Sequence, residues 1–199
     1  MNTSAADCSA FDHDPRVERT CAAIIEAAGA LLRADGPDAV THANVAGSAN
    51  VSRTTAYKHY PTRAALLRAA IESIDKHDFD DLEFSDDLAT DVRNIFSGFV
   101  ADLGDAEQSK LMATMMSRAL HDPALAQVRD EFMAELRPVI SEAFRRAIAR
   151  GELRADLDLE LAWRTISGSL VFTRFLTSDP VDDEFLERVI DYFIEANAP

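Results

Sequence analysis

The stretch that decides the fold is Thr41–Tyr60, which reads THANVAGSANVSRTTAYKHY. Thr41 and Ser52 are residue types that favour the N-cap of a helix, so each predicts the start of a short helix. Between the two helices, Asn50 tolerates a left-handed backbone better than most residues and can form a tight turn. Pro61 ends the second helix. Two short helices joined by a tight turn predict a helix-turn-helix unit.

The second short helix is rich in side chains that can donate hydrogen bonds or carry positive charge. They are Ser52, Arg53, Thr54, Thr55, Tyr57, Lys58 and His59. Arginine and lysine can neutralise phosphates or read guanine, and hydroxyl groups donate to phosphate oxygens. Arg63 follows near the start of the next helix, where free backbone amides also favour an anion. A polar surface helix would share this composition, and only the spacing of the residues favours DNA contact over that alternative.

The distribution of charge supports DNA contact more than the total does. The chain has a net charge of −15, yet residues 41–71 contain no Asp or Glu and include four cations. Subtracting these four positive charges from −15 leaves −19 for the remainder. Salt screens charges beyond about 8 Å at physiological ionic strength. An acid-free surface can therefore meet phosphates although the whole chain is acidic.

Further helices are predicted on both sides of this unit. Residues 1–14 are polar, small and acidic, and predict a disordered tail. Apolar residues recur at three- and four-residue spacing over 15–34 and again from Leu66 to Ile74, which predicts two longer helices. We expect residues 15–75 to form one three-helix-type DNA-binding domain.

The remainder, residues 76–199, also predicts helices and no strands, so the expected fold class is all-α. The expected helices are 87–103, 106–120, 123–149, 159–176 and 183–196. Pro138 falls inside the third of these and is expected to kink or split it. Residues 72–91 carry nine acids against one lysine, which favours a solvated helix end and loop over a cation or basic-partner site.

The residues of the central stretch resemble a known family. Thr41-x3-Val45-Ala46-x2-Ala49-Asn50-Val51-Ser52-x2-Thr55-x-Tyr57-x-His59-Tyr60-Pro61-x-Arg63-x2-Leu66-Leu67 resembles the N-terminal signature of the TetR family of transcriptional regulators. The segment Gly151-Glu152-Leu153-Arg154-x-Asp156-Leu157-Asp158-x-Glu160-Leu161-Ala162 is similar to one found in many members. The family more often has Gly at position 50 and Lys at position 63.

The resemblance implies a set of DNA contacts. Thr41 and Tyr57 would anchor phosphates, with Arg63 near the backbone, while other side chains of the second helix would face the groove. The full set of candidate DNA-binding residues is Thr41, His42, Ser52, Arg53, Thr54, Thr55, Tyr57, Lys58, His59 and Arg63. Val45, Ala46, Val51, Ala56 and Tyr60 are expected in the core of this domain.

The resemblance also implies a homodimer and a small-molecule effector. Wide apolar faces on the last two helices predict a dimer interface formed by Leu161, Ile166, Leu170, Phe172, Phe175, Phe185, Val189, Ile190 and Phe193. The middle helices are rich in aromatic residues and methionine, which is typical either of core packing or of an adaptable pocket for an apolar or amphipathic effector. The candidate effector-binding residues are Phe96, Phe99, Met112, Met115, Met116, Arg118, Phe132 and Trp163. The implied function is a ligand-responsive regulator, most simply a repressor, that binds a palindromic operator.

Composition and the absence of certain motifs argue against several other classes of protein. No apolar stretch reaches the ~20 residues of a membrane span and no signal sequence begins the chain, so we expect a cytoplasmic protein without membrane contact. Two cysteines and five scattered histidines predict neither a disulfide framework nor a metal site. No catalytic constellation or cofactor motif occurs, so no enzyme is expected. The alternative is a dimeric helical interaction protein with lost or weak DNA binding.

Overall fold

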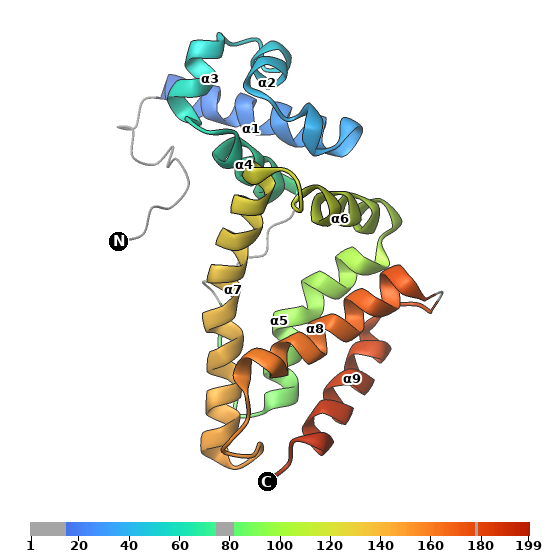
Figure 1. The fold of residues 1–199 in the computed structure, drawn as a ribbon. Coiled ribbons are helices and arrows are strands. Elements are labelled where there is room, and N and C mark those ends of the chain that lie inside the picture. The colour runs from blue at the N-terminus through green and yellow to red at the C-terminus, as the bar shows by residue number, and fades with distance from the viewer. Residues whose placement is uncertain (1–14, 75–81, 178) are drawn as a thin grey trace. The chain divides into compact units, whose positions relative to one another are not determined.

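The computed structural model describes residues 15–74, 82–177 and 179–199. Every regular element within these ranges is helical, and they contain no strand (Figure 1). The expected all-α class is confirmed. The predicted tail, residues 1–14, and part of the acid-rich stretch lie outside the described residues. No helix among those described has both the length and the apolar character to cross a membrane.

The described residues divide into two compact units. The first unit contains residues 15–74 and 114–131, and the second contains 82–113 and 132–199. The boundary at 75/76 that the sequence suggested stays a prediction. The structure adds that a later segment of the chain, residues 114–131, groups with the N-terminal unit.

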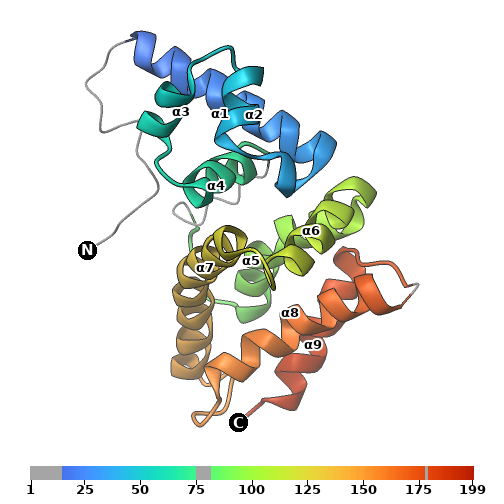
Figure 2. The same cartoon turned by 45° about the horizontal axis from the view of Figure 1, so that its top comes forward.

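The first unit is built on a long helix packed against shorter ones. Its elements are α1 (Pro15–Asp35), the 3₁₀ turn η2 (Pro37–Ala39), α2 (His42–Ser48), α3 (Arg53–His59) and α4 (Arg63–Ile74). In Figures 1 and 2, α2 and α3 lie side by side, and α1 packs against both α2 and α4. Gly29 permits close approach of α1 to α4, because a Cβ there would lie 2.3 Å from Ser73 Oγ. This packing buries Ile24, Leu32, Leu66 and Leu67 completely.

The second unit packs its helices around one apolar core. Its elements are α5 (Leu88–Gly104), the first part of α6 (Ala106–Arg118), most of α7 (Pro123–Arg150), α8 (Leu159–Leu176) and α9 (Asp183–Ala196). The core contains Phe96, Phe144, Ile166, Leu170 and Phe193. Both α6 and α7 therefore contribute residues to both units.

The sequence predicted a kink or a split at Pro138; helix α7 excludes the split, and the kink stays a prediction. The helix continues unbroken from Pro123 to Arg150 with Pro138 inside it, so the proline does not split it. A proline in a helix interior removes one backbone hydrogen bond. Leu136 on one side of it and Ile140 and Phe144 on the other pack into the same core, and this burial holds the helix together across the missing bond.

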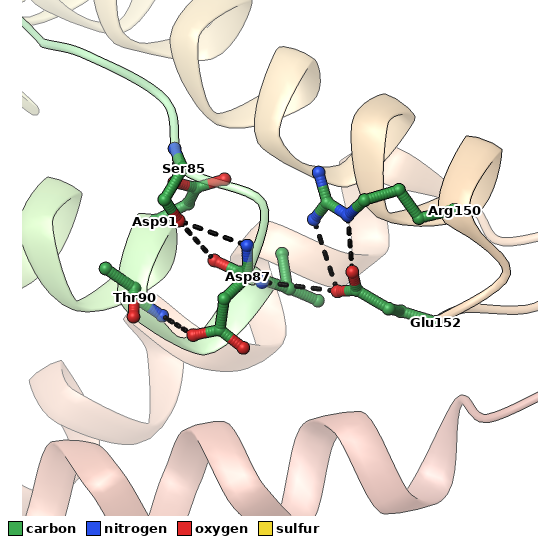
Figure 3. A network of polar contacts seen from close by, with 7 residues as sticks. Ser85, Asp87, Thr90, Asp91, Arg150 and Glu152 are labelled. Atoms are coloured by element: carbon green, nitrogen blue, oxygen red, sulfur yellow. Dashed lines mark hydrogen bonds and ion pairs between the residues drawn. The ribbon is translucent and has the colours of Figure 1, made fainter.

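A polar network surrounds Glu152, just after the end of α7 (Figure 3). Gly151 has a left-handed backbone with φ 78°, which lets Glu152 N–H donate to Ala147 O at 2.9 Å. The turn presents the Glu152 carboxylate to Arg150 and to Leu88 N–H, the latter at 3.2 Å. The α7–α8 turn thus fixes the first turn of α5.

The acid-rich stretch supplies caps to the same network. Asp87 accepts a hydrogen bond from Thr90 N–H at 2.8 Å, which caps α5. Hydrogen bonding with the Thr90 side chain, and then with this N–H, lowers the pKa of Asp87. Asp91 is 1% exposed and accepts from Ser85 N–H at 2.6 Å. At least these two acids therefore have structural roles in the fold.

Candidate DNA-binding, effector and dimer sites

The turn between α2 and α3 has the geometry that the sequence predicted. Asn50 has φ 54° and is the one non-glycine residue with positive φ among those described. Val51 N–H donates to Ala46 O at 3.0 Å, and Asn50 N–H donates to Gly47 O at 3.3 Å. This is the Schellman arrangement that ends a helix on a left-handed residue. It directs the chain from α2 straight into α3.

Both N-caps of the helix-turn-helix unit are formed as predicted. Thr41 Oγ1 accepts from Asn44 N–H at 3.2 Å, and Ser52 Oγ accepts from Thr55 N–H at 3.0 Å. The hydroxyl groups of Ser52 and Thr55 lie 2.8 Å apart. Each cap satisfies a backbone donor that would otherwise lack a partner. The two hydroxyl groups at positions 52 and 55 are therefore already engaged in holding α3.

Helix α3 has one buried and one exposed face. Ala56 is fully buried and Tyr60, just after the helix, is 3% exposed. Burial, followed by the charge of Glu72, raises the pKa of Tyr60 to about 12. The exposed residues are Ser52, Arg53, Thr54, Tyr57 and Lys58. The structure thus brings these five predicted contacts together on the solvent side of one short helix, and it buries the predicted core residues Val45, Ala46 and Ala56.

Tyr57 is supported by a histidine from the neighbouring helix. The rings of His42 and Tyr57 are stacked, with centroids 3.8 Å apart and planes 9° apart. His42 Nε2 lies 2.6 Å from Tyr60 O and donates to it. His42 is only 7% exposed, whereas Tyr57 is 53% exposed. His42 therefore holds the Tyr57 ring rather than facing solvent itself.

His59 is also held inside the protein. It is 6% exposed, and its Nδ1 lies 3.4 Å from Cys21 Sγ on α1. Burial, and then the charge of Lys58, lowers the pKa of His59. DNA contact by His42 and His59 remains a prediction that this geometry does not favour, because both rings face protein atoms.

Arg63 was expected near phosphates, but its guanidinium is engaged within the first unit. It donates to Val40 O at 3.0 Å, to Pro37 O at 2.8 Å and to Asp122 Oδ2 at 2.5 Å. Asp122 was not among the residues predicted for the site. Its position directly before Pro123 is an N-cap signal, since Asp is a favoured N-cap and proline a favoured first helical residue.

The residues proposed for an effector do not all lie in one unit. Phe96, Phe99, Met112 and Trp163 belong to a single apolar cluster of the second unit, and the rings of Phe96 and Phe99 meet edge to face at 6.5 Å. Phe132 also belongs to the second unit and is 36% exposed. Met115, Met116 and Arg118 belong to the first unit, where Arg118 pairs with Asp38 at 2.5 Å. These three therefore belong to a different unit from the cluster.

The residues proposed for a dimer interface fall into three groups by exposure. Ile166, Leu170, Ile190 and Phe193 are 0–4% exposed, so they are part of the core of their own unit and have little surface to offer a partner. Phe175, Phe185 and Val189 are half-buried against that core. Leu161 and Phe172 are 62% and 57% exposed. An interface role for these four residues stays a prediction that their burial does not favour, because helical periodicity cannot tell which side of a helix faces its own unit.

The structure adds two exposed apolar residues to Leu161 and Phe172. Leu176 is 71% exposed and Tyr192 is 73% exposed. Leu161, Thr165, Gly168, Phe172 and Leu176 follow one another at three- and four-residue spacing and form an exposed stripe along α8. A Cβ at Gly168 would meet no atom within 4 Å. We call these five residues the α8 stripe.

Comparison with known proteins identifies the family of both units. The family model described as bacterial regulatory proteins, tetR family, matches residues 24–84. The model described as tetracyclin repressor-like, C-terminal domain, matches residues 84–193. The two models together cover most of the chain.

Individual proteins agree with the family models. The DNA-binding transcriptional repressor TetR of Mycobacteroides abscessus is 28% identical over 178 residues, 88% of this chain and 92% of that protein. A TetR transcription regulator from Haloarcula marismortui has the same fold, with a TM-score of 0.67 at 18% identity over 92% of this chain and all of that one.

A transcriptional regulator from Saccharomonospora viridis, solved in complex with choline, has a TM-score of 0.61 at 18% identity. The match covers 90% of this chain and 97% of that one. At this identity the likeness concerns the fold alone.

The helix-turn-helix geometry and the two family models lead to one conclusion: the chain belongs to the TetR family of transcriptional regulators and carries its DNA-binding domain.

Proposed function

We propose that the protein is a repressor that binds a palindromic operator as a homodimer and is released from DNA by a small apolar or amphipathic effector. The observation that carries the proposal is the exposed face of α3, where Arg53, Thr54, Tyr57 and Lys58 lie at positions i, i+1, i+4 and i+5. Residues at this spacing share one side of a helix. A helix with donors and cations on one exposed side suits the major groove.

The homodimer rests on the α8 stripe. Exposed leucine and phenylalanine side chains at helical spacing are typical of a surface that another helix covers. Gly168 at the centre of the stripe would let the backbone of a partner helix approach closely. A twofold dimer also supplies two recognition helices to a palindromic site.

The effector rests on the cluster around Trp163. Trp163 Nε1 and Arg174 Nε are buried and have no hydrogen-bond partner among the described residues. Buried donors without a partner cost free energy, so an acceptor group on a bound molecule would be stabilised beside either donor. The regulator from Saccharomonospora viridis was solved with choline, which supports the idea that this fold can hold a small molecule. We include no enzymatic activity in the proposal.

A salt-dependent binding experiment tests the DNA-binding part. A labelled duplex from the region upstream of the gene is titrated at several salt concentrations with the wild type, Arg53→Ala and Lys58→Ala. Losing Arg53 should cost about 1–3 kcal/mol and relax sequence preference. Losing Lys58 should weaken binding to all sequences and reduce the slope of log affinity against log salt by about 1.

Arg145→Ala is the control, because Arg145 is an exposed cation of the second unit that pairs with Glu142. It should leave the titration unchanged. Absence of binding by the wild type at low salt would instead favour a helical interaction protein without DNA binding.

Effector binding can be followed through Trp163, which is the one tryptophan of the chain. Small amphipathic molecules that change its emission should also lower the affinity for DNA, because a ligand shifts an equilibrium only through different affinities for the two states. Emission changes without loss of DNA affinity would contradict the proposed release.

A further inference from the structure

The guanidinium of Arg63 joins two segments of the first unit that are far apart in sequence. Arg63 is the first residue of α4. Its Nε and Nη2 donate to Val40 O and Pro37 O, at 3.0 and 2.8 Å, in the segment that leads into α2. Its Nη1 donates to Asp122 Oδ2 at 2.5 Å, at the turn between α6 and α7.

Asp122 is itself fixed by the start of α7. Its Oδ1 accepts from Ala124 N–H at 2.9 Å, so one carboxylate both caps α7 and pairs with Arg63. Burial acts to raise the pKa of Asp122, but the bonds from Arg63 and the α7 amides outweigh it and the pKa lies below its ordinary value. The carboxylate is therefore charged near neutral pH. Charge-assisted bonds of this kind are about twice as strong as neutral ones.

A second ion pair joins the same two segments. Arg118, the last residue of α6, lies 2.5 Å from Asp38 in η2. Both side chains are more than half exposed, so this pair contributes little free energy by itself. It does repeat the connection between the α6–α7 turn and the segment 37–40. The part-buried bonds of Arg63 to the two carbonyl groups and to Asp122 carry the connection.

We infer that Arg63 is a positioning residue for the helix-turn-helix unit, acting through Asp122 and the carbonyl groups of segment 37–40, rather than a phosphate contact. Helices α6 and α7 continue from this turn into the second unit. Arg63 thus fixes the start of α2 to the two helices that the DNA-binding unit shares with the rest of the chain. The inference rests on the proposed DNA-binding function and assigns this residue within it.

Conservative variants separate the two roles of Arg63. Arg63→Lys keeps the positive charge but loses the fork that reaches three acceptors. Asp122→Asn keeps the cap of α7, because asparagine caps as well as aspartate, but loses the ion pair. A phosphate contact would tolerate the first change and would gain from the second, which removes a negative charge.

The experiment is a double-mutant cycle on a duplex recovered by the wild type from a random-sequence library. Both single variants should lose affinity, each roughly tenfold, which is about 1.4 kcal/mol. The double variant should bind no more weakly than either single one, because both remove the same interaction. Arg63→Gln should leave the salt slope unchanged, whereas the matched variant Lys58→Gln should reduce it by about 1.

Thermal melting of the same four proteins supplies an independent readout of the junction. Losses of Tm that are less than additive show that Arg63 and Asp122 act together. The inference is overturned if Asp122→Asn binds DNA as well as or better than the wild type, or if Arg63→Gln reduces the salt slope by about 1. If the variants show coupled Tm losses but the wild type recovers no duplex from the library, the proposed function is overturned instead. If the Tm losses are additive and DNA binding is intact, the inference alone is overturned.

Discussion

At the scale of single residues, most of the helix-turn-helix unit follows from local chemistry. Thr41 and Ser52 cap their helices as their hydroxyl groups predict, and Asn50 adopts the left-handed backbone that the turn requires. These features depend on groups within five residues of one another, so the sequence contains the information needed to predict them. His42 and Arg63 behave differently, because their partners Tyr60 and Asp122 lie 18 and 59 residues away.

The backbone at Asn50 gives a prediction about stability. Asn50→Ala should lower the free energy of unfolding by about 1 kcal/mol, because a Cβ without a compensating polar group is strained at positive φ. Asn50→Gly should match or exceed the wild type. Urea denaturation measures both.

Ala49→Gly is the matched control for Asn50. Ala49 has φ −78°, so glycine brings no relief there and should destabilise the unit by about 0.5–1 kcal/mol. Equal effects of glycine at positions 49 and 50 would contradict the assignment of strain to Asn50.

At the scale of helices, the sequence located the elements closely. The spans predicted for α8 and α9 are those observed, and α1, α5, α6 and α7 differ at their ends by one or two residues. The apolar spacing and the flanking Gly and Pro residues were sufficient for this. The contact face of each helix was harder to predict, as Ile166 and Leu170 show, since burial depends on which helices pack together.

The contact between α1 and α4 gives a prediction at this scale. Gly29→Ala adds a Cβ that meets Ser73 Oγ, which donates to Ala70 O at 2.7 Å, so the serine must turn away and lose that bond. Alanine is a better helix former than glycine by about 1 kcal/mol, which offsets part of the loss. The double variant Gly29→Ala/Ser73→Ala should therefore be more stable than Gly29→Ala alone.

Thermal melting measures the Tm of Gly29→Ala and of the double variant, with Ser73→Ala as the reference. In the Ser73→Ala background, Gly29→Ala should raise Tm, because the new Cβ then lies in ordinary contact with the Ser73 Cβ position at 3.6 Å. A fall in Tm in that background would mean that the two helix backbones are too close for any side chain at position 29.

At the scale of the whole molecule, the α8 stripe gives a prediction about assembly. Gly168→Arg adds bulk where a Cβ meets nothing within 4 Å of the same chain, and arginine favours a helix more than glycine does. The single chain should therefore fold normally, while a dimer that buries the stripe should dissociate. The affinity of the Gly168→Arg variant for a palindromic duplex should also fall, because a monomer has one recognition helix.

Sedimentation at several concentrations checks this, with Arg145→Ala as a control that keeps the wild-type mass. A Gly168→Arg variant that sediments as the wild type does would place the interface elsewhere. A wild type that is monomeric at micromolar concentration would contradict the proposed homodimer itself.

The sequence by itself determined the helices, the caps, the turn at Asn50 and the family, because each depends on neighbouring residues or on a motif of fixed spacing. The tertiary structure decided which of the candidate residues face solvent. It buried His42 and His59, engaged Arg63 with Asp122, and divided the apolar residues of α8 between the core and the exposed stripe. The physical reason is that burial and pairing depend on groups distant in sequence, which only the packing of the helices brings together.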